Sequence, residues 1–107
     1  MNRVLQQHKA DFFKAMSSPM RLAMLEALAE KEFTVTQLAE RVGLDVSTAS
    51  RHLSQLRAAG VVRATRSGST LVYQLADERV GELLGLARSI IATQLHATSE
   101  MLADLGA

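Results

Sequence analysis

The side chains best able to form specific polar contacts in this 107-residue chain lie in one short segment, residues 47–55. They combine hydroxyls, an amide and one cation: Ser47, Thr48, Ser50, Arg51 and Gln55. No acidic residue occurs from residue 46 to residue 76. Arg and Gln can donate to acceptors on base edges, and hydroxyls can donate to phosphate oxygens. The segment therefore suits the major groove of a nucleic-acid duplex, although the same residues also occur on ordinary solvated helix faces.

A helix is expected to position this segment. Asp45 is a suitable N-cap, and Gly60 is a suitable stop after a helix that ends at about residue 59. At about 100° per residue, the apolar positions fall opposite the polar ones. These apolar positions are Ala49, Leu53 and Leu56.

A shorter helix is expected just before it, over residues 37–42, with Thr36 as its N-cap. Gly43 provides the turn, because a residue without Cβ adopts a positive φ at little cost. Two helices joined by a short turn with Gly are typical of a helix-turn-helix motif. Thr36 and Gln37, at the amino end of this first helix, would then contact phosphates.

A β-hairpin is expected directly after the second helix. Residues 61–66 and 71–75 alternate with a period of two, and SGST lies between them. A hairpin in this place is a wing beside the recognition helix. Arg63 lies on one face of the hairpin and Arg66 lies at its tip. Cations at these positions could contact the nucleic-acid backbone or the minor groove.

Four stretches of the chain form a family pattern in combination: FKAMSSPMRLAML at 13–25, QLAERVGL at 37–44, STASRHLSQLRAAGVV at 47–62, and a wing that ends in VYQL. Together, residues 12–75 resemble the ArsR/SmtB family of winged-helix transcriptional repressors. The resemblance implies a homodimer that binds double-stranded operator DNA and releases it when an inducer arrives. It also implies that His52 supports helix packing or contacts a phosphate. Val46 departs from the pattern, since the family often has Gln there.

The expected fold is a single domain over residues 1–107, mainly α with a small β-hairpin wing, of the winged helix-turn-helix class. We expect dimerisation helices at 1–16 and 77–105, the helix-turn-helix at 36–60 and the wing at 61–75. Asp77 is expected to cap the last helix, whose long apolar stripe extends beyond the winged core. Such a stripe needs a partner, and we expect the first and last helices of a second copy. Gln94 and Thr98 interrupt it, either to fix the dimer register or to line a small pocket.

Positive charge is concentrated in the expected reading segment. Residues 1–75 hold ten Lys and Arg against six Asp and Glu, a net of +4, and residues 76–107 hold two against five, a net of −3. Residues 45–75 alone carry four Arg and one Asp, a net of +3. The net charge of +1 therefore hides an asymmetry that favours nucleic-acid binding. Arg21 could reach DNA or be a solvated residue early in its helix, and the second interpretation is favoured.

Two metal sites common in the family are not expected here. The first would need cysteines where this chain has Thr34-Val35-Thr36, and hydroxyls are poor ligands for soft ions. The second would need ligands at four positions that here hold Asp77, Arg79, Ile90 and Thr93. The absence of cysteine excludes thiol chemistry and favours the cytoplasm. No apolar run approaches the roughly eighteen residues of a membrane span, and no cofactor motif is present.

Two alternatives remain open. A non-family metal site could form at His8, His96 and Glu100, because His96 and Glu100 are four residues apart on one helix. The winged fold could also serve as a protein-interaction module, although the acid-free segment argues against it. No catalytic constellation is present, so an enzyme is not expected. The sequence identifies no small-molecule inducer and no operator sequence.

Overall fold

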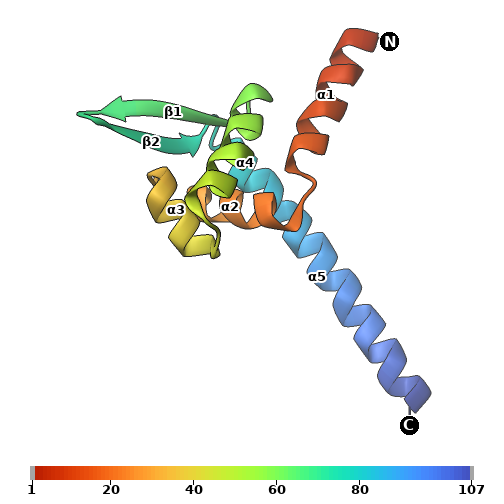
Figure 1. The fold of residues 1–107 in the computed structure, drawn as a ribbon. Helices are drawn as coiled ribbons and strands as arrows, with labels where there is room; N and C mark the ends of the chain where they lie inside the picture. Colours follow the sequence, from red (N-terminus) through yellow and green to blue (C-terminus); the bar gives the residue numbers. More distant parts are fainter. Residues whose placement is uncertain (1, 107) are drawn as a thin grey trace.

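The computed structural model describes residues 2–106, and its seven elements follow the order α1–α2–α3–α4–β1–β2–α5 (Figure 1). The helices are α1 (Arg3–Met16), α2 (Pro19–Glu30), α3 (Val35–Val42), α4 (Val46–Ala58) and α5 (Arg79–Gly106). The strands are β1 (Val62–Ser67) and β2 (Thr70–Leu75). The winged helix-turn-helix expected from the sequence is confirmed. Residue 1 of the expected first dimerisation helix and residue 107 lie outside the described residues.

The helix ends follow local capping rules, with one correction. The side chain of Thr34, not Thr36, caps α3: Thr34 Oγ1 accepts from the Gln37 amide at 3.2 Å, and Gln37 Oε1 accepts from the Thr34 amide at 3.0 Å. This reciprocal pair satisfies two amide groups, whereas Thr36 would satisfy one. The expectation that Thr36 is the N-cap was therefore wrong. Gly43 ends α3 with φ of 75°, as expected.

The core lies where α2, α3, α4 and the start of β1 meet. Its largest side chains, each with no more than 2 % exposure, are Met24, Leu25, Leu38, Leu53, Leu56, Val61 and Val62. The long outer helices contribute little to it, since Met16 is the buried residue of α1 and Val80 that of α5. The helix-turn-helix is thus held by the core, while most of α1 and α5 lies outside it.

The wing is an antiparallel hairpin whose register pairs Arg63 with Gln74 and Arg66 with Leu71. Its base is joined by a third piece of chain between α2 and α3. Phe33 forms an isolated antiparallel bridge with Tyr73, through N···O distances of 3.2 and 2.7 Å between their main chains. The bridge ties the base of the wing to the helix-turn-helix.

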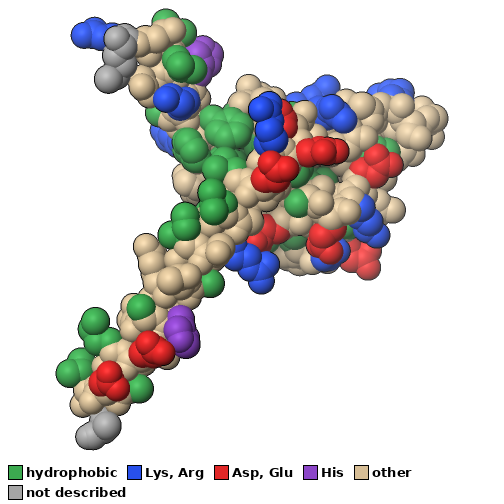
Figure 2. Space-filling model, turned by 180° about the vertical axis from the view of Figure 1, so that it is seen from behind, with side chains coloured by type: hydrophobic (Ala, Val, Ile, Leu, Met, Phe, Trp, Pro, Cys, Tyr) green, Lys and Arg blue, Asp and Glu red, His purple; other side chains and the backbone are tan. Residues whose placement is uncertain are grey.

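Two helical arms, α1 and most of α5, project from the body (Figure 1). Hydrophobic side chains continue along both arms and meet where the arms join the body (Figure 2). We name the exposed apolar residues of α5 the α5 strip: Leu86, Ile90, Ile91, Leu95, Met101, Leu102 and Leu105, each more than half exposed. On α1, Val4, Leu5 and Phe13 are similarly exposed. Within residues 2–106, no helix is long and apolar enough to cross a membrane.

Candidate nucleic-acid interface

Helix α4 has the two faces that its sequence indicates. Ala49, Leu53 and Leu56 have 0 % exposure and pack into the core. On the other side, Ser47, Ser50 and Arg51 are exposed, and Thr48 is half-buried. The core therefore holds one side of α4 and leaves its hydroxyls and one guanidinium facing outward.

Asp45 adds a carboxylate to the amino end of this face. It caps α4 by accepting from the Thr48 amide at 3.1 Å, and it also accepts from the Thr48 hydroxyl at 2.6 Å and from the Ser47 hydroxyl. These hydrogen bonds, first from Ser47 and then from Thr48, hold the pKa of Asp45 well below its ordinary value. Sequence reasoning identified the cap but missed that it binds both hydroxyls. Their spacing, two and three residues after Asp45, was the available signal.

We expect Asp45→Asn to bind DNA more tightly than the wild type at low salt. Asn caps a helix about as well as Asp, so the fold should be retained while an anion near the phosphates is removed. Fluorescence anisotropy on duplex DNA would measure the affinity, with Asp45→Ala as the comparison that loses the cap and should unfold at lower temperature. Weaker binding by Asp45→Asn would instead show that the carboxylate holds Ser47 and Thr48 in their binding orientation.

His52 and Gln55 lie on the side of α4 that faces α1 and α2, where both contact Arg21. Arg21 Nε donates to His52 Nδ1 at 3.0 Å, and Nη2 donates to Gln55 Oε1. Arg21 Nη1 donates to the carbonyl oxygen of Ala15 at 3.0 Å. We call these four residues the Arg21 cluster. The expectation that Arg21 is merely solvated was therefore wrong.

The pKa of His52 lies below its ordinary value of 6.5. Burial is the largest cause, because the half-buried ring loses hydration of its charged form, and the charges of Arg21 and Arg51 add to the effect. The structure thus favours a neutral imidazole whose Nδ1 lone pair accepts from Arg21.

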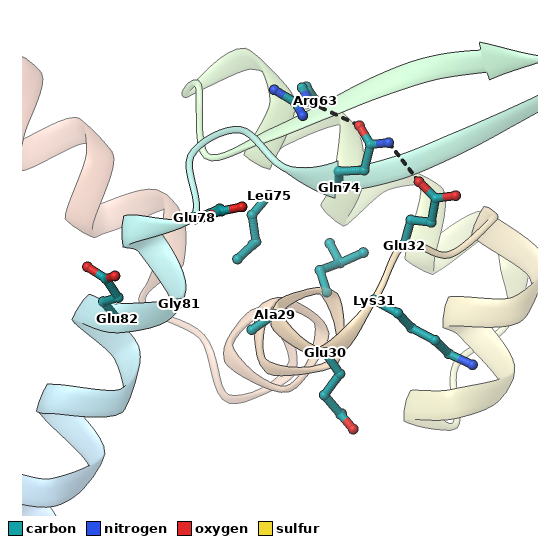
Figure 3. Close-up of a pocket in the computed structure, with 11 residues that line it drawn as sticks. Ala29, Glu30, Lys31, Glu32, Arg63, Gln74, Leu75, Glu78, Gly81 and Glu82 are labelled. Atoms are coloured by element: carbon teal, nitrogen blue, oxygen red, sulfur yellow. Dashed lines mark hydrogen bonds between the residues drawn. The ribbon is translucent and has the colours of Figure 1, made fainter.

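The arginines of the wing differ in their surroundings. Arg63 Nε donates to Gln74 Oε1 at 3.0 Å, and Gln74 Nε2 donates to Glu32 Oε2 at 2.8 Å (Figure 3). These three residues also line a hollow of about 660 Å³ between the wing, the end of α2 and the start of α5. Arg66 is exposed close to the turn, where Gly68 has φ of 64°.

The amino end of α3 presents Thr36 and Gln37, which are both exposed. Thr36 lies in the first turn of the helix. The side-chain oxygen of Gln37, Oε1, is used in the capping box, so the hydrogens on its side-chain nitrogen, Nε2, remain the groups suited to a phosphate.

The residues considered as metal ligands form ion pairs or stand apart. Arg79 Nη2 lies 2.7 Å from Asp77 Oδ2, and its hydrogen bonds lower the pKa of Asp77 to about 2. His96 Nε2 lies 3.1 Å from Glu100 Oε1 in an exposed pair on α5, while His8 is exposed on α1. In the part of the chain that the structure describes, no three His, Asp or Glu residues are grouped to hold a metal ion.

Several proteins with similar sequences are named as regulators of transcription. Residues 18–64 match the family described as "Bacterial regulatory protein, arsR family". An HTH-type transcriptional regulator of Mycobacterium tuberculosis, Rv0081, is 40 % identical over 104 residues, which cover 96 % of this chain and 91 % of the relative. The nodulation protein NolR of Rhizobium meliloti is 37 % identical over 85 % of this chain and 75 % of its own.

Solved structures agree with the fold. The crystal structure of Rv0081 superposes with a TM-score of 0.81 at 37 % identity and covers 92 % of this chain and 98 % of its own. The homodimeric winged helix-turn-helix DNA-binding domain of Mb0332 from Mycobacterium bovis gives a TM-score of 0.83 at 32 % identity, over 88 % of this chain and 87 % of that domain.

Proposed function

Because the chain belongs to the ArsR family of bacterial regulatory proteins, we propose that it represses transcription as a homodimer bound to operator DNA. It is a DNA-binding transcriptional regulator and not an enzyme. The observation that carries the proposal is the outward face of α4, where hydroxyls and Arg51 project from a helix held by a core on its other side. Such a helix fits the major groove.

We assign the contacts by their place on the molecule. Ser47, Thr48, Ser50 and Arg51 of α4 read or anchor in the major groove. A second group contacts phosphates: Thr36 and Gln37 at the start of α3, with Arg63 and Arg66 of the wing. Arg63 must exchange its bond to Gln74 for a phosphate, whereas Arg66 is already exposed. His52 and Gln55 act indirectly, through Arg21.

The dimer is proposed to form through α1 and α5. The α5 strip is exposed in one protomer, and burying such a surface against a second copy is favourable. The Mb0332 domain with this fold is homodimeric. A two-fold dimer places two copies of α4 about 34 Å apart, so the operator should be a pseudo-palindrome. Because the chromosome of a bacterium lies in the cytoplasm, we place the protein there.

The test is anisotropy binding to the DNA upstream of the protein's own gene, at several salt concentrations and with or without Zn²⁺. We expect tight binding that prefers this sequence over scrambled DNA and does not respond to zinc. Weak binding to any DNA that is lost at moderate salt would contradict the proposal and favour a protein-interaction module. Loss of binding with zinc would point to a metal site that includes His8, His96 and Glu100.

Arg66→Ala should weaken binding to operator and scrambled DNA by the same factor. An exposed wing arginine that contacts a phosphate releases counterions on binding, so its removal should lower the salt slope by about 1 per contact. Salt titrations of both DNAs would measure this. A loss confined to the operator would show that Arg66 reads bases.

A further inference from the structure

We propose that Arg21 is a positioning residue that fixes α4 relative to α1, and that it does so only while His52 is neutral. The inference rests on the proposed function, since it concerns how the recognition helix is held for operator binding. It assigns Arg21, His52 and Gln55 to one arrangement that the sequence did not indicate.

The Arg21 guanidinium joins three helices. From its place on α2 it donates to Ala15 on α1 and to His52 and Gln55 on α4. The Ala15 carbonyl belongs to the last turn of α1, where carbonyls lack partners within the helix. A planar guanidinium has several donors in a fixed arrangement and can satisfy three separate acceptors, which an ammonium on a flexible chain does less well.

Helix α2 itself does not favour a cation at this position. Arg21 lies in the first turn of α2, where the helix dipole disfavours positive charge. Its favourable partners are the carboxyl end of α1, where the dipole favours a cation, and two neutral acceptors on α4. The side chain is therefore best explained as a tie, by which we mean the set of hydrogen bonds that links α1 to α4 through Arg21.

The tie matters because α1 is held to the body only near its carboxyl end, where Phe12 and Ala15 are half-buried against the core. Met16 is the buried residue of α1, at its last position, and the helix projects from the body (Figure 1). In the proposed dimer α1 contributes to the interface and α4 enters the groove. The angle between these two helices therefore sets the separation of the two reading helices, which must match about one turn of DNA.

The tie depends on the protonation of His52. Nδ1 can accept from Arg21 only as a lone pair, so the neutral ring must carry its hydrogen on Nε2. A second proton would place N–H against the guanidinium and add a like charge. The charged groups around the cluster are Arg21 on α2 and Arg51 on α4, with Asp11 and Lys14 of α1 beside Arg21 and Gln55.

The direction of the pH effect follows from the lowered pKa of His52. The folded structure favours the neutral ring of His52. The stabilisation that this neutral ring gives to the folded protein is therefore complete above the ordinary pKa of 6.5, and it is lost as pH falls through the lower pKa. Operator binding should weaken over the same range.

The test compares wild type, Arg21→Lys and His52→Asn by operator anisotropy at about pH 7.5 and at steps down to about pH 5, around the ordinary histidine range. Arg21→Lys should lose about tenfold to 100-fold in affinity at the higher pH, the usual cost of losing hydrogen bonds to a charged group. His52→Asn keeps an acceptor near the place of Nδ1 and cannot be protonated there. It should therefore bind with a flatter pH profile than the wild type.

His96→Asn is the matched control, because it removes an exposed histidine on α5 that is far along the chain from the cluster. It should keep the pH profile of the wild type. Circular dichroism and sedimentation would confirm that each variant is a folded dimer, and His52→Asn alone decides the test if Arg21→Lys does not fold.

The inference would be overturned if folded Arg21→Lys bound as the wild type does, or if His52→Asn kept the same loss at low pH. The proposed function fails separately, if the wild type shows no operator preference at the higher pH.

Discussion

Replacing Leu95 by glutamate should dissociate the dimer and abolish tight operator binding. Leu95 belongs to the α5 strip and is 65 % exposed in one protomer, so the substitution should leave the fold of that protomer intact. In a dimer the new carboxylate would be buried against apolar side chains without a partner, which is strongly unfavourable. Because the two half-sites bind together, losing the dimer should reduce affinity by about 10²- to 10⁴-fold. Sedimentation and operator anisotropy would measure both effects.

Ser89→Glu is the matched control for this variant. It adds the same charge to an exposed position on α5, on the side away from the α5 strip, and should leave the dimer intact. Circular dichroism of Leu95→Glu should still show a folded chain. A Leu95→Glu protein that remains dimeric and binds the operator normally would show that the dimer forms elsewhere.

Arg51→Ala should cost about 1–3 kcal/mol of operator binding and relax the preference for one base pair in each half-site. Arg51 is exposed at the centre of the outward face of α4, where a guanidinium can donate to two acceptors of guanine. The loss should be larger on the operator than on scrambled DNA, because phosphate contacts are common to both. Competition between operators with single base changes would locate the affected pair.

Arg57→Ala provides the comparison. It removes the same charge from the last turn of α4, away from Arg51 around the helix, and should affect both DNAs only slightly. Equal losses for Arg51→Ala on operator and scrambled DNA would assign Arg51 to the phosphates. Unchanged affinity would show that this face of α4 is not the reading surface.

Most of the fold could be predicted because its signals are local. Pro19 after Ser18 begins α2, Asp45 begins α4 and Gly43 ends α3, as their capping properties indicate. The period-two pattern located the wing, although its strands extend to Ser67 and begin at Thr70. The error at Thr36 arose because Thr34, two residues earlier, is an equally suitable cap by residue type. The choice between them was settled by Gln37, whose side chain pairs with Thr34.

The candidate site was less predictable because its contacts join distant parts of the chain. Arg21 lies 31 residues from His52 and 34 from Gln55. Gln74 lies 42 residues from Glu32. Periodicity shows which residues share a face of one helix, but it does not show how that face is turned against another element. The sequence could therefore place Gln55 on α4, but it could not show that Arg21 donates a hydrogen bond to the side-chain oxygen of Gln55.

The bridge between Phe33 and Tyr73 divides the wing into two mechanical parts. At its base three pieces of chain are joined by main-chain hydrogen bonds, while towards Gly68 only two strands continue. The base should move with the helix-turn-helix as one stiff unit, and the tip should bend with little cost. Arg66 is thus carried by a compliant tip on a rigid support. Such an arrangement can follow grooves of different width, so the wing can respond to the shape of the DNA while α4 responds to its bases.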